Sequence, residues 1–227
     1  MSTLRIVLRT ALNVAVYGVL LFVPAGTLRW PAAWTLLALV FIAMLATRFS
    51  AFGAADALIA ERRKPPFVKD QPFADKVLVG AFLVVIPAFI AFIPLDVFHL
   101  HLMMPPVLAL TMAGLLLAGA GWTLIAAAFS ANAFAVPIVK DQSDRGQTVI
   151  DGGIYAFIRH PLYAGVVLTL IGIALWLGSV AAALTSVVPF CVIVARIVVE
   201  EKFLRTRLTG YDAYAARVRY RLVPGIW

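Results

Sequence analysis

Long apolar stretches recur along this chain and decide the environment in which it can fold. A helix needs about 20 apolar residues to cross the hydrocarbon core of a bilayer. Six candidate stretches lie at about residues 6–23, 34–47, 76–94, 106–129, 162–177 and 181–204. Charged residues make up 13% of the chain, about half the share that is usual in soluble domains. We therefore predict an integral membrane protein with about six spanning helices.

The same environment selects the secondary structure. An open sheet edge would leave backbone N–H and C=O groups unpaired in lipid, so the spans are expected to be helical. The last two spans are joined by Gly178 and Ser179, a connection short enough to force an antiparallel hairpin. We predict an all-α, polytopic membrane bundle. Residues 1–129 would form four N-terminal spans, and residues 130–227 a region with this helical hairpin and a polar tail that carries the site.

Basic residues set the expected orientation. The chain has 19 Lys and Arg against 11 Asp and Glu, a net charge of +8. With six spans, all of these basic residues except Arg29 fall on one side, and cytoplasmic loops are the ones that collect Lys and Arg. We therefore expect both termini in the cytoplasm. The basic segments on that side include residues 48–76, 130–159 and the C-terminal tail. This explanation by topology leaves no reason to expect nucleic acid as a partner.

Motif searches exclude several classes of protein. The sequence has no Walker motif, no GxGxxG opening a βαβ unit, no GxSxG and no HExxH. Its single cysteine, Cys191, cannot form an intramolecular disulfide or a cysteine-cluster metal site. His99 and His101 lack a convincing third ligand, so we expect no metal centre.

Polar residues cluster in the C-terminal region instead. Pro161 suits the first turn of a helix, and His160 and Tyr163, three residues apart, would share one face. Arg196 and Glu200 are four apart near the end of the last span and would also share a face. Arg196 lies within apolar sequence, where charged residues usually face a cavity or a partner. An interfacial helix start and a surface ion pair are the alternative interpretations of the two motifs.

Taken together, these elements resemble the isoprenylcysteine carboxyl methyltransferase and phospholipid methyltransferase superfamily, over roughly residues 139–227. The resemblance rests on five ordered elements: Gly153-x-Tyr155, Arg159-His160-Pro161-x-Tyr163-x-Gly165, Arg196-x-x-x-Glu200-Glu201, Tyr211-x-x-Tyr214-x-x-Arg217-Val218 and Arg221-Leu222-Val223-Pro224. It implies a membrane enzyme that uses S-adenosylmethionine.

The resemblance also implies roles for individual residues. Arg196 and Glu200 would be the catalytic pair, with Arg196 and Arg217 binding the methyl acceptor. The residues expected around the cofactor are Gln147, Thr148, Val149, Ile150, Tyr155, His160, Pro161, Leu162, Tyr163 and Glu200.

Several acceptors and one other reaction remain open. A lipidic carboxylate, as in prenylcysteine methylation, needs a cation to orient it, and Arg196 presents a planar fork. A phospholipid amine would instead need a proton acceptor such as Glu200 or Glu201. Membrane sterol reductases share a similar Arg-His-Pro-x-Tyr hairpin but use NADPH. A non-enzymatic membrane scaffold or channel is the remaining alternative. The expected partners are a lipidic or prenylated substrate and membrane lipids.

Overall fold

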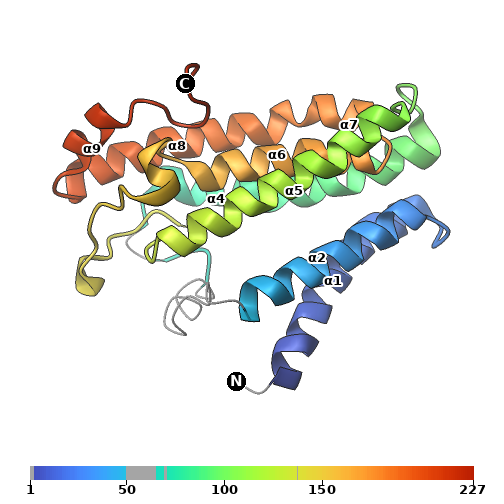
Figure 1. Ribbon diagram of the computed structural model, residues 1–227, viewed down its shortest axis with the longest axis horizontal. Helices are drawn as coiled ribbons and strands as arrows, with labels where there is room; N and C mark the ends of the chain where they lie inside the picture. Colours follow the sequence, from blue (N-terminus) through green and yellow to red (C-terminus); the bar gives the residue numbers. More distant parts are fainter. Residues whose placement is uncertain (1–2, 50–64, 69–70, 137) are drawn as a thin grey trace. The chain divides into compact units, whose positions relative to one another are not determined.

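The computed structural model describes residues 3–49, 65–68, 71–136 and 138–227 (Figure 1). The main helices are α1 (Thr3–Ala25), α2 (Pro31–Phe49), α4 (Phe73–Leu95), α5 (Leu108–Ala131), α6 (Pro161–Trp176), α7 (Val180–Thr185), α8 (Val187–Arg207) and α9 (Tyr211–Arg217). Three short helical turns complete the set: η1 (Asp96–Leu100), η2 (Ser143–Arg145) and η3 (Gly153–Ala156). These described residues contain no strand, and the all-α prediction is confirmed.

Four of the helical segments are long and apolar enough to cross a membrane: Thr3–Ala25, Phe73–Leu100, Leu108–Ala131 and Val180–Arg207. Two shorter apolar helices, Pro31–Ala46 and Pro161–Trp176, coincide with the second and fifth predicted spans. An integral membrane protein is thus supported, whereas the number of six spans is not confirmed. Most of the basic segment 48–76 lies outside the described residues.

The last predicted span is not one uninterrupted helix. The Ser179 side chain accepts a hydrogen bond from the Ala182 N–H and caps α7, which ends at Thr185. Ser186 then separates α7 from α8. Pro189 lies in the first turn of α8, where its missing N–H costs no helical hydrogen bond. The two helices together still form one candidate span, Val180–Arg207, so the sixth predicted span is present with a one-residue break at Ser186.

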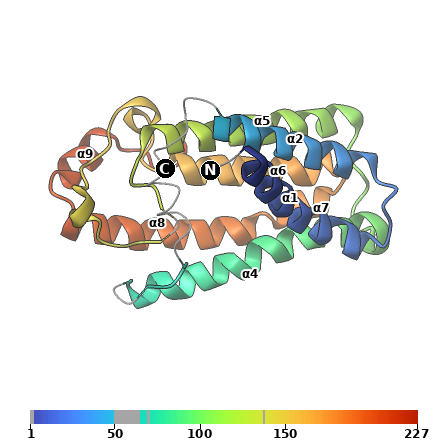
Figure 2. The ribbon, with the colours of Figure 1, turned by 90° about the horizontal axis from the view of Figure 1, so that it is seen from below.

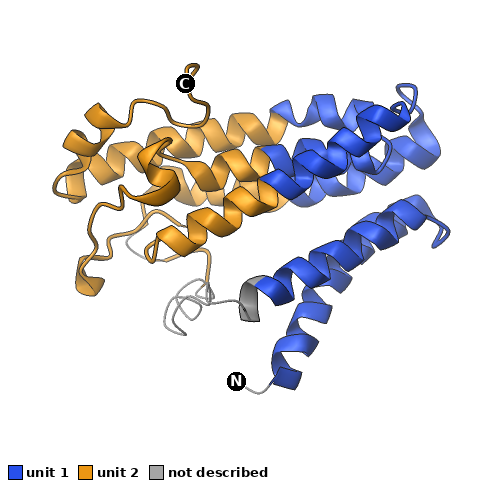
Figure 3. Cartoon of the chain, in the orientation of Figure 1, with its two compact units in different colours: residues 1–53, 85–120, 168–187 blue, residues 54–84, 121–167, 188–227 orange. Residues whose placement is uncertain are grey.

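The chain forms two compact units, each assembled from segments far apart in sequence (Figure 3). Unit 1 consists of residues 1–53, 85–120 and 168–187. Within it α1 packs against α2, and the Trp176 indole N–H donates to the Ala32 carbonyl at 2.9 Å. Buried Asp96 accepts hydrogen bonds from the Ser179 hydroxyl at 2.6 Å and the Leu102 N–H at 2.9 Å. Polar contacts therefore tie η1 to the start of α7.

Unit 2 consists of residues 54–84, 121–167 and 188–227, and it contains the motifs of the C-terminal region. Its core joins Ile158 and Ala164 to Ile193 and Ile197 of α8 and to Leu222 of the tail. A second cluster joins Tyr211, Tyr214, Ala215 and Val218 to Val149. In both ribbon views α9 lies at the end of α8 with the segment around Val149 beside it (Figures 1 and 2). The boundary predicted between residues 129 and 130 falls inside this unit.

Close helix packing in unit 2 depends on Gly165. A Cβ atom at this position would lie 2.6 Å from the Gly121 carbonyl oxygen and 2.8 Å from Ile125 Cγ1. Both distances are shorter than real carbon contacts, so α5 and α6 can approach this closely only without a side chain here. The contact sets the start of α6 against the end of α5, and the polar segment after α5 leaves from this point.

Candidate functional site

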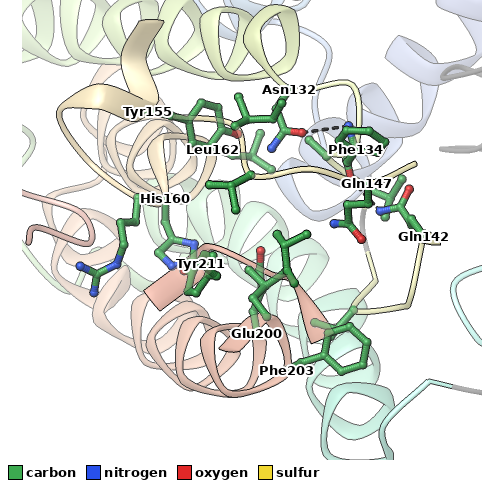
Figure 4. A pocket seen from close by; sticks show the side chains of 18 of the residues that line it. Asn132, Phe134, Gln142, Gln147, Tyr155, His160, Leu162, Glu200, Phe203 and Tyr211 are labelled. Atoms are coloured by element: carbon green, nitrogen blue, oxygen red, sulfur yellow. Dashed lines mark hydrogen bonds between the residues drawn. The ribbon is translucent and has the colours of Figure 1, made fainter. Parts of the chain in front are cut away.

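A pocket lies in unit 2 (Figure 4). It is bounded by the segment after α5, the first turn of α6, the C-terminal end of α8, and α9. The polar segment contributes Asn132, Gln142 and Gln147, α8 contributes Glu200 and Phe203, and α9 contributes Tyr211. Asn132 fixes the turn at the pocket's edge, because its side-chain oxygen accepts the Phe134 N–H at 2.8 Å. The wall thus mixes amides, one carboxylate, aromatic rings and aliphatic side chains.

Most of the residues predicted around the cofactor line this one pocket. They are Gln147, Thr148, Val149, Ile150, Tyr155, His160, Leu162, Tyr163 and Glu200. Pro161 is fully buried at the first position of α6, behind the wall. Arg196 is buried and does not line the pocket, although it contacts Tyr163, which does. Arg217 does not line the pocket; it is exposed and forms an ion pair with Asp151. The functional roles of all these residues remain predictions.

Glu201 connects α8 to the Arg-His-Pro motif and to the C-terminal tail. One carboxylate oxygen, Oε1, accepts hydrogen bonds from Arg159 Nε at 2.7 Å and lies 3.1 Å from His160 Nε2. The other oxygen, Oε2, lies 3.0 Å from both Nε and Nη2 of Arg221. The Arg159 and Glu201 side chains are each 4% exposed. This carboxylate is therefore fully engaged as a structural group, which argues against Glu201 as a proton acceptor.

Arg159 also fastens the tail to the start of α6. Its Nη1 donates to the carbonyls of Val218 at 2.6 Å and Arg219 at 2.9 Å. The backbone N–H groups of Arg159 and His160 donate to the carbonyls of Tyr220 and Arg221, both at 2.9 Å. The Nε and Nη1 donors of this buried arginine therefore have a carboxylate and backbone carbonyls as acceptors. The Arg-His pair is thus part of the framework as well as of the pocket wall.

Glu200, one residue earlier, faces the pocket. Its Oε2 accepts the Tyr163 hydroxyl hydrogen bond at 2.8 Å. Arg196 Nε donates to the same hydroxyl at 3.4 Å, and the guanidinium lies 6.0 Å from the Phe82 ring centroid. The predicted face shared by Arg196 and Glu200 is therefore confirmed in geometry, with the Tyr163 hydroxyl between the two side chains.

Asp75 is a member of this cluster that the sequence analysis missed. Its side chain is fully buried on α4, and Oδ1 lies 3.6 Å from Arg196 Nη2. Oδ2 accepts the Gln71 side-chain amide at 2.6 Å and the Val139 N–H at 2.9 Å. Oδ1 accepts no hydrogen bond from the described residues. Asp75 thus joins α4 to Arg196 and to the pocket wall at Val139.

The aromatic wall of α9 is neutral over a wide pH range. Burial raises the pKa of Tyr211, and the nearby Glu201 and Glu200 carboxylates raise it further. Burial likewise raises the pKa of Tyr214, whose hydroxyl donates to the Tyr155 carbonyl at 2.9 Å. The two phenols therefore act as hydrogen-bonding and stacking groups near neutral pH.

Comparison with known families supports the resemblance. The model of the phospholipid methyltransferase family matches residues 109–209, slightly less than half of the chain. A comparison with the curated proteins gave no match. The matched region runs from the start of α5 through α8, and it includes the Arg-His-Pro motif and the Arg196–Glu201 segment. It confirms the predicted resemblance of this region to the superfamily of isoprenylcysteine carboxyl methyltransferases and phospholipid methyltransferases.

Proposed function

We propose that this protein is an integral membrane methyltransferase that uses S-adenosylmethionine to methylate a lipidic acceptor. The observation that carries the proposal is the single pocket that gathers nine of the residues predicted around the cofactor, within the region that matches the phospholipid methyltransferase family. The NADPH-dependent reductase, considered from the sequence, gains no support from the family match.

The pocket's chemistry suits this cofactor. S-adenosylmethionine carries an ammonium, a carboxylate, a sulfonium and an adenosine, and it supplies an electrophilic methyl group. Glu200 would attract the positive end, and Gln147 and Gln142 offer amides for the polar atoms of the ribose and base. Leu162 and Tyr163 lie in the first turn of α6, whose backbone N–H groups favour an anion. Tyr155 and Tyr211 provide apolar ring surface.

The charges around Arg196 favour a phospholipid amine as the acceptor. Two carboxylates, Asp75 and Glu200, surround the single guanidinium of Arg196, directly or through Tyr163. A carboxylate acceptor would add a third negative charge to this cluster, in which Asp75 and Arg196 are buried, whereas the ammonium of an amine headgroup would be attracted to it.

Glu200 would then accept the proton. The headgroup ammonium first loses a proton to Glu200, or through it to water, and the lone pair of the nitrogen then forms its bond to the methyl carbon as the carbon–sulfur bond breaks. Tyr163 holds the Glu200 carboxylate in place through its hydroxyl. Precise alignment is the main contribution that such a site makes to an in-line displacement.

A lipidic carboxylate, as in prenylcysteine methylation, is the second candidate. Its support is Arg196, a buried guanidinium one turn from Glu200 that could hold a carboxylate through two N–H groups. In either case the acceptor would come from the membrane and the cofactor from the cytoplasm. The basic tail and the basic segment 130–159 support a topology with both termini in the cytoplasm.

Binding of S-adenosylhomocysteine to the purified full chain in micelles, measured by calorimetry, tests the cofactor. We expect saturable binding that Leu162→Trp abolishes, because the larger ring fills the pocket. Leu184→Trp is the matched control, since Leu184 is 64% exposed on α7 and does not line the pocket. Absence of binding in folded wild-type protein would refute the proposal.

The acceptor is tested with S-adenosylmethionine labelled in its methyl group. Vesicles of phosphatidylethanolamine should become labelled in their headgroup, whereas vesicles of phosphatidylcholine alone should not. Label in a farnesylcysteine analogue, and none in phosphatidylethanolamine, would replace the amine by the carboxylate candidate. Glu200→Gln should lower turnover with the amine more than it lowers S-adenosylhomocysteine affinity.

A further inference from the structure

A second groove lies on a different face of α8 from the pocket. It is lined by Val198, Glu201, Lys202, Arg205, Thr206 and Arg221. Three of these six side chains are cationic, and they come from two segments, α8 and the tail. The residues of α8 that line the pocket are Glu200, Phe203 and Leu204, so the two openings have none of their lining residues in common.

The exposed face of α8 changes from apolar to basic at this groove. Cys191, Val198, Lys202 and Arg205 follow at spacings of seven, four and three residues, which places them along one helix face. Cys191 and Val198 are exposed, as is expected of side chains that contact lipid tails. Lys202 lies one turn beyond Val198, about 6 Å along the helix. This face therefore passes from hydrocarbon depth to headgroup depth between Val198 and Lys202.

The three cationic side chains of the groove differ in how strongly they are paired with acidic side chains of the protein. Lys202 makes no ion pair with any residue in the described part of the chain. Arg205 pairs with Asp212, but both side chains are largely exposed, and such pairs contribute little. Arg221 contacts Glu201, and its guanidinium stacks 5.0 Å from the Trp227 ring centroid, so its position is fixed. Arg159 shares the charge of Glu201, which leaves the groove with a positive balance.

We propose that this groove binds the phosphate of an anionic phospholipid, with Lys202, Arg205 and Arg221 around the phosphate and the acyl chains along Val198. The apolar residue at the mouth and the lipid-facing stripe below it favour a bilayer lipid over a free phosphate ion. Arg221 and the pocket residue His160 contact the same carboxylate, Glu201, so the bound lipid would also support the wall of the pocket. The site does not depend on the proposed methyl transfer.

The test measures lipids retained by the full chain after transfer to neutral detergent, by native mass spectrometry. Equal amounts of phosphatidylglycerol and phosphatidylcholine are offered. We expect preferential retention of phosphatidylglycerol and a loss of about tenfold or more in the Lys202→Gln/Arg205→Gln variant. Lys202→Gln alone should lose part of the preference without unfolding, because Lys202 makes no ion pair with the residues that the structure describes.

The matched control is Arg207→Gln/Arg219→Gln, which removes the same charge from exposed residues that do not line the groove. Equal losses in the two double variants would indicate diffuse electrostatic attraction and overturn the proposal. A second arm offers glycerol 3-phosphate in place of lipid and measures the thermal unfolding midpoint. Stabilisation by glycerol 3-phosphate equal to that by phosphatidylglycerol would also overturn it, since the groove would then bind a free phosphate.

Discussion

Replacement of Glu201 by glutamine should lower the stability of this protein far more than the same replacement at Glu200. Glu201 neutralises Arg159 and Arg221 and contacts His160, and its side chain is 4% exposed. Glutamine keeps the volume but loses the charge. Its amide group would also direct two donors at side chains that themselves donate.

The magnitude follows from the burial of the partners. Arg159 is as buried as Glu201, and removal of one partner of a buried pair costs about 3–5 kcal/mol because the remaining charge is uncompensated. Arg221 is 30% exposed and can be solvated, so it adds little. For a chain of this size, each kcal/mol lowers the unfolding midpoint by about 2–4 °C. The expected decrease is therefore about 6–20 °C.

Thermal unfolding in micelles, followed by tryptophan fluorescence, measures this decrease. Glu200→Gln is the matched control on the adjacent residue. Its amide oxygen can still accept the Tyr163 hydroxyl hydrogen bond, so a cost of less than about 1 kcal/mol is expected. A Glu201→Gln midpoint within about 2 °C of the wild type would refute the assignment of Glu201 as a buried structural partner.

Three other changes test separate parts of the structure. Asp75→Asn keeps an oxygen for the Val139 N–H but removes the charge near Arg196, so we expect turnover to fall at least tenfold while S-adenosylhomocysteine affinity, measured by calorimetry, changes less. Gly165→Leu should prevent close packing of α5 and α6 and lower the unfolding midpoint, whereas Gly119→Leu, with nothing within 4 Å of its added Cβ, should not. Burial raises the pKa of Tyr214, so its contribution to stability is complete below about pH 10 and is lost as the pH rises further. In Tyr214→Phe, the thermal unfolding midpoint should therefore fall less steeply above about pH 10 than in the wild type.

The sequence predicted helix positions well because a bilayer imposes a length and an apolar composition on each span. It predicted the pocket residues through ordered motifs in the C-terminal region, and nine of them line one pocket. It could not predict the break at Ser186, where apolar residues continue on both sides. It also could not distinguish Glu200 from Glu201, since consecutive helix residues point about 100° apart and the sequence does not say which direction faces the pocket.

Asp75 illustrates a more general limit on sequence reasoning about membrane enzymes. The third predicted span began at about Lys76, so Asp75 fell just outside it. Yet the described helix begins at Phe73 and carries Asp75 fully buried in its first turn. A carboxylate can be buried there because α8 supplies a guanidinium and the segment after α5 supplies a backbone N–H. Both partners are distant in sequence. A charged side chain at the end of a span is thus easily left outside it by hydropathy, and only the tertiary structure reveals its partners.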